Sequence, residues 1–144
     1  MMGKEAVILC AEKEIEIRFG EVDMMGVVWH GSYATYLEDA REAFGAKYGL
    51  SYMKYIVEYT FAPIVELNFS YRKPLRYGMK PRVRITYRPS DAAKILFDYE
   101  IYNPEDGEVY LKAHSTQVFM DRDYHLLWES PAFYVEWKKQ MGLL

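Results

Sequence analysis

Residues 32–49, SYATYLEDAREAFGAKYG, carry the strongest helical pattern of the chain. Apolar positions recur there at intervals of three and four and form one stripe along about four helical turns. Ser32 is a candidate N-cap, and Gly49 stands where a left-handed residue closes a helix. The stripe predicts one long helix with one buried face, made of Tyr33, Tyr36, Leu37, Ala40, Phe44 and Tyr48.

Strand patterns flank this helix. Residues 14–19 alternate polar and apolar side chains before it, as a half-buried strand does. Turn residues separate four further strand patterns after it, at residues 64–72, 82–88, 95–101 and 109–120. Ser130 and Pro131 then predict the start of a short helix with Phe133 and Trp137 on one side. This order predicts an α+β arrangement in which one antiparallel sheet buries the long helix, and the pattern alone leaves the exact fold open.

The composition indicates one folded domain over residues 1–144. A chain of this length buries about two-thirds of its unfolded surface in a single core. Hydrophobic residues make up 51% of the chain, which excludes an intrinsically disordered protein. The single cysteine, Cys10, allows no intramolecular disulfide and fits a reducing compartment. The apolar run near the N-terminus is too short for a membrane span or a signal peptide, so we expect a cytoplasmic protein.

The net charge of −3 conceals a basic segment. Residues 72–88 hold seven basic side chains and no acid, which leaves 11 basic against 21 acidic residues elsewhere. A local positive field on an acidic protein suits a small polyanion better than a nucleic acid. The alternative is that these are ordinary solvated positions of a twisted strand pair. The basic side chains are Arg72, Lys73, Arg76, Lys80, Arg82, Arg84 and Arg88.

The loop before the helix, residues 20–33 (GEVDMMGVVWHGSY), holds the residues with chemical potential. Asp23 lies between a strand pattern and a helix start, where backbone N–H groups have no partner inside the helix. A carboxylate beside free donors suits attack on a carbonyl, either directly or through an activated water. The alternative role is structural, because an aspartate before Gly26 also forms an Asx-turn.

Residues 23–30 (DMMGVVWH), followed by Tyr33, Glu38 and Arg41, resemble the signature of the 4-hydroxybenzoyl-CoA thioesterase branch of the hotdog-fold acyl-CoA thioesterases. The likeness covers residues 15–131. Within this branch, the sequence resembles the bacterial short-chain acyl-CoA thioesterases associated with the Tol-Pal system. The resemblance implies a five-stranded antiparallel sheet wrapped around one long central helix. It also implies homodimers, or homotetramers built from dimers, with active sites at the subunit interface. The implied activity is hydrolysis of a short-chain aliphatic or aromatic acyl-CoA, without a cofactor.

The resemblance also implies roles for individual residues. Asp23 would be the nucleophile or general base, and the backbone N–H of His30 would polarise the thioester carbonyl. The His30 imidazole is a secondary candidate for the general acid, and a surface or capping histidine is the structural alternative. The basic segment would help to hold the phosphates of CoA. The expected substrate-binding residues are Gly26, Tyr33, Tyr71, Arg72 and Arg88.

Glu38 and Arg41 are spaced i, i+3, which predicts a salt bridge on the helix. Hotdog enzymes of other branches place a catalytic carboxylate on this helix, so a catalytic Glu38 is the alternative. We interpret His114 and His125 as structural.

The sequence shows no metal-ligand spacing and no glycine-rich phosphate loop, so we predict neither a metal nor a nucleotide cofactor. Two other hotdog functions stay open: an acyl-CoA-binding module without catalysis, and an enoyl hydratase or dehydratase. Met24 and Met25 stand where the family commonly has small residues or proline, which leaves the identity of the acyl group open.

Overall fold

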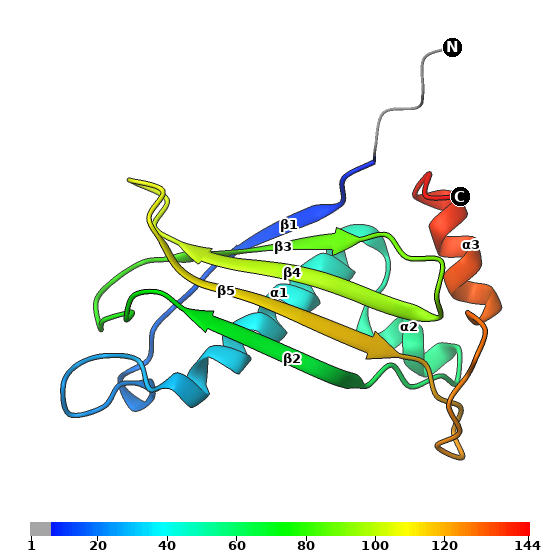
Figure 1. Cartoon of the computed structure of the whole chain (residues 1–144), viewed down its shortest axis with the longest axis horizontal. Helices are drawn as coiled ribbons and strands as arrows, with labels where there is room; N and C mark the ends of the chain where they lie inside the picture. Colours follow the sequence, from blue (N-terminus) through cyan, green and yellow to red (C-terminus); the bar gives the residue numbers. More distant parts are fainter. Residues whose placement is uncertain (1–6) are drawn as a thin grey trace, which may run out of the picture.

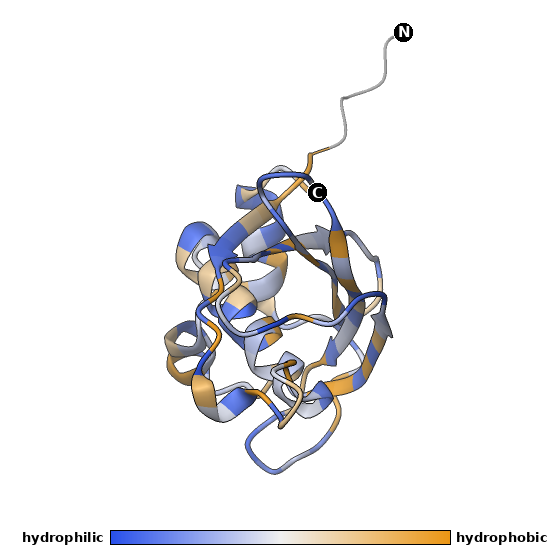
Figure 2. Cartoon of the chain, turned by 90° about the vertical axis from the view of Figure 1, so that its left-hand side faces the viewer, coloured by the Kyte–Doolittle hydropathy of each residue, from blue (hydrophilic) through white to orange (hydrophobic). Residues whose placement is uncertain are grey.

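The computed structural model describes residues 7–144, in which a five-stranded antiparallel sheet packs on the long helix α1, Tyr33–Tyr48 (Figure 1). An end-on view shows the helices gathered on one side of the curved sheet (Figure 2). This architecture confirms the predicted α+β hotdog fold. The first six residues of the expected domain lie outside the described part of the chain. The strand order is β1-β3-β4-β5-β2, with bounds β1 Cys10–Glu14, β2 Ile64–Tyr71, β3 Arg82–Arg88, β4 Lys94–Tyr102 and β5 Val109–Val118.

The predicted apolar stripe of α1 forms the centre of the core. Tyr33, Tyr36, Leu37, Ala40 and Phe44 are all buried, and Tyr48 packs against the edge of the core. They meet the inward-facing rows of the central strands, which alternate with outward polar residues as a half-solvated sheet requires. At the end of the helix, Gly49 has a φ of 78°, and its N–H donates to the Gly45 carbonyl at 2.9 Å. The predicted left-handed C-terminal cap is therefore confirmed.

The first strand was predicted at the wrong place. Residues 14–19 alternate as expected, and Ile15 and Ile17 are buried, but the strand itself is Cys10–Glu14. Glu14 pairs with Arg82, the first residue of β3, so no strand backbone is left for the following residues to pair with. The alternation in residues 14–19 therefore indicates which side chains are buried, but it does not indicate which residues form the hydrogen bonds of the strand.

The helix starts also differ in detail from the prediction. Ser32 makes no side-chain capping bond, because a 3₁₀ turn, η2 (His30–Ser32), precedes α1 and gives Ser32 helical dihedral angles. The C-terminal helix α3, Ala132–Gln140, is confirmed, with Pro131 at the cap position instead of the first helical position. The six-residue helix α2, Tyr52–Val57, was not predicted, because it is too short to show a periodic stripe. A further 3₁₀ turn, η1, spans Phe19–Glu21.

The sheet has two edges, β1 and β2. Among residues 7–144, β2 pairs with β5 on one side only, so its other side presents unpaired backbone groups there. Its side chains are mostly exposed or half-buried, in contrast to those of the central strands. Across residues 7–144, no helix combines the length and apolar character needed to cross a membrane.

Candidate active site

A narrow hairpin presents Asp23 at the N-terminal end of α1. Val22 and Val28 form an antiparallel bridge, and the Asp23 N–H donates to the Val27 carbonyl at 2.9 Å. Gly26 turns the chain with a φ of 76°, and its N–H donates to the Asp23 carbonyl at 3.0 Å. Residues with a Cβ are strained at such a φ, so the turn requires glycine. Gly26, which the resemblance assigns to the substrate-binding residues, is thus the residue that turns the hairpin.

Of the two oxygens of the Asp23 carboxylate, only Oδ1 accepts hydrogen bonds within the described residues. Oδ1 accepts the Met25 N–H at 2.8 Å and lies 3.4 Å from the Val27 nitrogen. The Asx-turn is therefore present. Within residues 7–144, Oδ2 accepts no hydrogen bond, and the side chain is exposed. The turn fixes the orientation of the carboxylate through Oδ1 and leaves Oδ2 exposed.

His30 begins the 3₁₀ turn that leads into α1. Its backbone N–H has no acceptor in the described part of the chain, as expected for the first residues of a helical segment. The partial positive charge of a helix N-terminus strengthens such a donor toward a developing oxyanion. The exposed His30 ring packs near Trp29, with centroids 5.1 Å apart. Over residues 7–144 the imidazole has no polar partner, and no hydrogen bond joins His30 to Asp23.

Two tyrosines hold the turn that carries His30. The Tyr71 hydroxyl donates to the His30 carbonyl at 3.0 Å. The Tyr33 hydroxyl accepts the Leu75 N–H at 3.2 Å, and the Val28 N–H donates to the Leu75 carbonyl at 2.8 Å. The Tyr33 and Tyr71 rings meet edge to face at 5.2 Å. Both predicted substrate-binding tyrosines thus lie beside His30, where their observed contacts support the backbone.

Tyr36 and Glu21 make a further support that sequence reasoning missed. The Tyr36 hydroxyl donates to Glu21 Oε1 at 2.9 Å, and the same oxygen accepts the Arg18 N–H at 2.7 Å. Burial, together with this carboxylate, raises the pKa of Tyr36, so its hydroxyl stays a neutral donor. The Trp29 N–H donates to the Glu21 carbonyl at 2.8 Å. Glu21 therefore fixes the base of the hairpin. The sequence indicates this role only through the presence of an acidic residue in a short turn.

The basic segment splits into two groups in space. The first group lies beside the hairpin, because Arg76 forms an antiparallel bridge with Val27 and the Tyr77 N–H donates to the Gly26 carbonyl at 3.1 Å. Arg72 directly follows Tyr71 and is exposed. The structure thus brings Arg72 and Arg76 to the same end of the molecule as Asp23.

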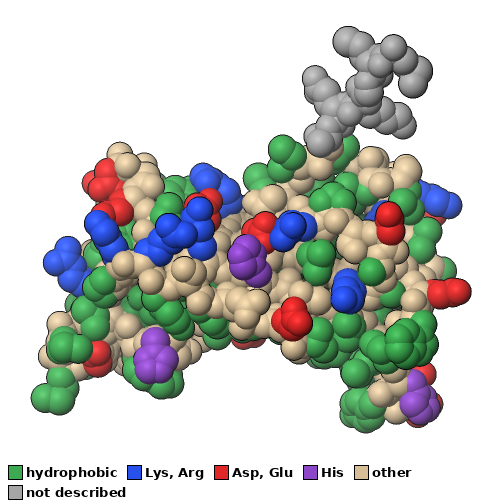
Figure 3. All heavy atoms as spheres, in the orientation of Figure 1, with side chains coloured by type: hydrophobic (Ala, Val, Ile, Leu, Met, Phe, Trp, Pro, Cys, Tyr) green, Lys and Arg blue, Asp and Glu red, His purple; other side chains and the backbone are tan. Residues whose placement is uncertain are grey.

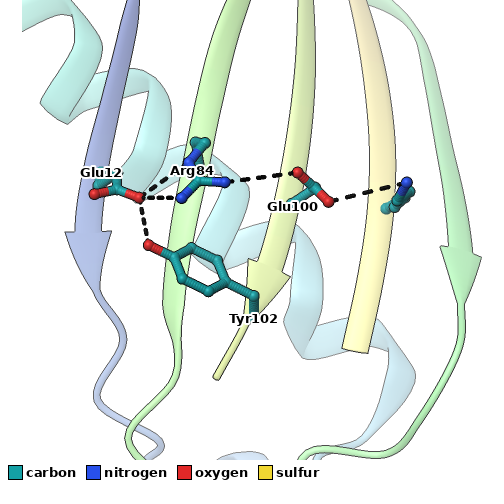
Figure 4. Close-up of polar contacts among 5 residues, drawn as sticks. Glu12, Arg84, Glu100 and Tyr102 are labelled. Carbon is teal, nitrogen blue, oxygen red and sulfur yellow. Dashed lines mark hydrogen bonds and ion pairs between the residues drawn. The ribbon is translucent and has the colours of Figure 1, made fainter. Parts of the chain in front are cut away.

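The second group lies on the outer face of the sheet. There Arg84 pairs with Glu12 at 2.9 Å and approaches Glu100 at 3.9 Å, and Tyr102 donates to Glu12 (Figure 4). The Tyr102 hydroxyl and the Arg84 guanidinium hold the pKa of Glu12 below its ordinary range. Acidic side chains accordingly lie beside basic ones on this face (Figure 3). For these residues, solvated positions of paired strands are the correct interpretation.

Arg88 belongs to this outer group. Its Nε lies 3.6 Å from Asp98 Oδ2, and Asp98 Oδ1 lies 2.5 Å from His114 Nδ1. The structure does not bring Arg88 together with Asp23 within one chain. A second His–Asp contact, His125 Nδ1 to Asp121 Oδ2 at 3.4 Å, lies in the turn after β5. Both histidines therefore have structural partners away from the hairpin.

A cavity of about 730 Å³ opens between α1, α2, residues 60–63 before β2, and the end of β5 with the turn that follows it. Glu38 and Arg41 both line it, but the salt bridge predicted between them is absent from the described residues. Arg41 instead donates from Nη1 to the buried Tyr99 hydroxyl at 3.2 Å, because its side chain reaches the inner face of the sheet. The i, i+3 spacing of Glu38 and Arg41 allows a salt bridge, but Arg41 bonds a tyrosine of the sheet instead.

Comparisons with known proteins agree with this geometry. Residues 17–137 match the family model described as the Thioesterase-like superfamily. The chain is 35% identical to the putative acyl-CoA thioesterase YneP of Bacillus subtilis, over 78% of this chain and 81% of that protein. It is 31% identical to the acyl-acyl carrier protein thioesterase ATL3 of Arabidopsis thaliana, over 78% of this chain and 60% of ATL3.

Solved structures show the same fold. The DHNA-CoA thioesterase of Staphylococcus aureus superposes with a TM-score of 0.80 at 29% identity, covering 93% of this chain and 92% of that one. A 4-hydroxybenzoyl-CoA thioesterase variant in complex with 4-hydroxybenzoyl-CoA superposes with a TM-score of 0.77 over 90% of this chain and 98% of that one. At 21% identity, this second likeness supports the fold alone.

Proposed function

Because this chain belongs to the Thioesterase-like superfamily of hotdog-fold thioester hydrolases, we propose that its hairpin site hydrolyses an acyl-CoA to the free acid and CoA. The observation that carries the proposal is that two groups without hydrogen-bond partners in the described residues lie at the same end of α1. Asp23 Oδ2 is free to act on a carbonyl carbon, and the His30 N–H is free to bind the carbonyl oxygen.

The reaction follows from the chemistry of these groups. Attack on the thioester carbon moves the carbonyl electron pair onto oxygen, where the His30 N–H stabilises the negative charge. Collapse of the tetrahedral intermediate breaks the carbon–sulfur bond, and the electron pair leaves with the CoA thiolate. If a water attacks, Asp23 takes its proton. If Asp23 attacks, the resulting acyl-aspartate anhydride is hydrolysed by water.

The proposed substrate carries a short aliphatic or an aromatic acyl group. The relative from S. aureus is named for an aromatic acyl-CoA, which supports the aromatic class. An acyl group on an acyl carrier protein is a variant supported by the name of ATL3. Arg72 and Arg76, beside the hairpin, are the proposed contacts for the CoA phosphates. The binding of CoA by Arg88 stays a prediction. Arg88 lies on the outer face of the sheet beside Asp98, and no contact among residues 7–144 supports that role.

We also propose that the working unit is a homodimer, or a homotetramer built from dimers, in the cytoplasm. The open edge of β2 supports pairing with a second copy. Apolar side chains exposed around the hairpin support the same arrangement, since Met24 is fully exposed and Met25 is 81% exposed. The unpaired Cys10 supports a reducing compartment.

Two assays test the proposed reaction. The first follows thiol release with a thiol reagent, and we expect release from butyryl-CoA and benzoyl-CoA. A 2-enoyl-CoA distinguishes the hydratase alternative, because hydration removes the conjugated double bond without releasing thiol. Binding of acyl-CoA without either reaction would mean a non-catalytic module.

A further inference from the structure

We propose that Tyr36 and Glu21 form a positioning pair, which sets the separation between the two reacting groups of the hairpin. These groups are the Asp23 carboxylate and the His30 N–H. The inference rests on the proposed function and deepens it, because it names two residues that control the reaction without touching the substrate. The pair acts through one hydrogen bond between the first turn of α1 and the base of the hairpin, from the Tyr36 hydroxyl to Glu21 Oε1 at 2.9 Å.

The two reacting groups belong to different arms of the hairpin. Asp23 ends the first arm, residues 21–23, and His30 directly follows the second arm, residues 27–29. At the base of the hairpin, the Trp29 N–H donates to the Glu21 carbonyl at 2.8 Å. The separation of the carboxylate from the N–H therefore depends on how each arm is held against α1.

The second arm is held through Tyr33, the first residue of α1. The Tyr33 hydroxyl accepts the Leu75 N–H at 3.2 Å, and the Leu75 carbonyl accepts the Val28 N–H at 2.8 Å. Val28 is buried and lies two residues before His30. A tyrosine of the helix thus anchors this arm close to the proposed oxyanion donor.

The first arm is held through Tyr36, which lies one helical turn after Tyr33. Tyr36 is 2% exposed, and its ring meets the Tyr33 ring edge to face at 6.0 Å, so the hydroxyl has a fixed position. Glu21 Oε1 accepts a hydrogen bond from this hydroxyl and another from the Arg18 N–H at 2.7 Å. Glu21 lies two residues before Asp23. Two neighbouring tyrosines therefore anchor each arm at the second residue before its reacting group.

The Tyr36 bond suits this task because its acceptor is a carboxylate. Hydrogen bonds to an ionised group are shorter and about twice as strong as those between neutral groups. Burial, together with the bond to Glu21, raises the pKa of Tyr36, so the hydroxyl stays protonated and continues to donate. Without this bond the first arm can shift against α1, and a misplacement of about 1 Å between reacting groups can lower a rate about a hundredfold.

Tyr36→Phe tests the bond, because it removes the hydroxyl and keeps the buried ring. We expect kcat to fall about tenfold and KM to change less than about twofold, since the substrate still binds but meets a displaced carboxylate. Tyr48→Phe is the matched control, because the Tyr48 hydroxyl donates to the Cys10 carbonyl at 2.9 Å at the other end of α1. It should lose similar stability in urea unfolding and keep its kcat. An unchanged kcat in folded Tyr36→Phe would overturn the proposal.

Two Glu21 variants test the acceptor. Glu21→Ala removes it and should lower kcat about tenfold, as Tyr36→Phe does. Glu21→Gln keeps a side-chain oxygen that can accept from both the Tyr36 hydroxyl and the Arg18 N–H, so its kcat should stay within about threefold of wild type. The double variant Glu21→Ala with Tyr36→Phe should lose no more than either single variant, because both changes remove the same bond. Equal losses in Glu21→Gln and Glu21→Ala would exclude the bond as the cause.

The Asp23→Asn background separates this inference from the proposed function. There, Tyr36→Phe should lower the residual rate of thiol release by less than about twofold, because the carboxylate that the pair positions is already gone. A full tenfold loss in that background would mean that the bond acts on another part of the site, and the inference would be wrong. Full activity of Asp23→Asn by itself would contradict the proposed function, so the two failures are distinct.

Discussion

The Tyr71 hydroxyl donates to the His30 carbonyl at 3.0 Å, and this bond ties the end of β2 to the turn that begins α1. The bond spans 41 residues of sequence. It holds the peptide that follows the free His30 N–H, so the edge strand and the proposed oxyanion donor are mechanically connected. If β2 also forms the dimer contact, association and catalysis share one tyrosine.

Tyr71→Phe removes this bond while keeping the ring. We expect kcat to fall about tenfold, because the His30 N–H loses its fixed orientation, and we expect about 1 kcal/mol of lost stability. Steady-state kinetics and urea unfolding measure the two effects. Tyr59→Phe is the control, because Tyr59 is 74% exposed and lies outside the hairpin. Unchanged kcat in Tyr71→Phe would show that the bond has no catalytic importance.

Gly26→Ala places a Cβ at a φ of 76° in the hairpin turn. The expected cost is about 1–2 kcal/mol in the free energy of unfolding, together with a loss of activity as the Asp23 turn distorts. Gly107→Ala is a matched control, since Gly107 has the same φ in the turn between β4 and β5, outside the hairpin. It should lose similar stability, measured by thermal unfolding, and retain kcat. Equal activity losses in both variants would mean that Gly26 matters only for folding.

Leu37→Ala tests the central stripe of α1. Leu37 is completely buried between α1 and the sheet, so the change leaves a cavity and should cost about 2–5 kcal/mol. Urea unfolding followed by tryptophan fluorescence measures the loss. The exposed Leu144→Ala should cost less than about 0.5 kcal/mol. A comparably small effect of Leu37→Ala would contradict the assignment of this stripe to the core.

Glu12 should contribute to acid sensitivity. Its hydrogen bond from Tyr102 and its pair with Arg84 hold its pKa below the ordinary value of 4.5. A lowered pKa in the folded protein means that the stabilisation is present above pH 4.5 and is lost as the pH falls through the folded-state pKa. Wild type should therefore exceed Glu12→Gln in stability at neutral pH, with the difference shrinking below pH 4.5. A difference that is constant with pH would exclude this ion pair as its cause.

The sequence predicts the parts of this molecule that depend on local periodicity. The α1 stripe, the central strands and the Gly49 cap follow from spacing and backbone chemistry, and the Asp23 loop was singled out by a motif. The position of β1 could not be predicted, because alternation records burial and the start of β3 decides where pairing stops. The Glu38–Arg41 pair was wrong for a similar reason: Tyr99, 58 residues from Arg41, is the partner.

The basic segment shows the same limit. Seven basic residues close in sequence predict one positive field, but alternate residues of β3 face outward toward acids of β1 and β4. Glu12 lies 72 residues from Arg84, so no local pattern reveals that pair. Asp98 and Glu100 lie on the next strand, where the register of β3 with β4 decides which base each acid meets. Only the group around Arg72 and Arg76 stays beside the hairpin.

The central claim is that Asp23 is the catalytic carboxylate, and thiol release by wild type and Asp23→Asn tests it most directly. Asparagine keeps the Asx-turn acceptor that bonds the Met25 N–H, so the hairpin should stay folded. We expect kcat to fall about a hundredfold or more on the best acyl-CoA, with the oligomeric state unchanged by size-exclusion chromatography. Equal rates for the two proteins would contradict the account and would make Glu38, on the wall of the cavity, the carboxylate to test next.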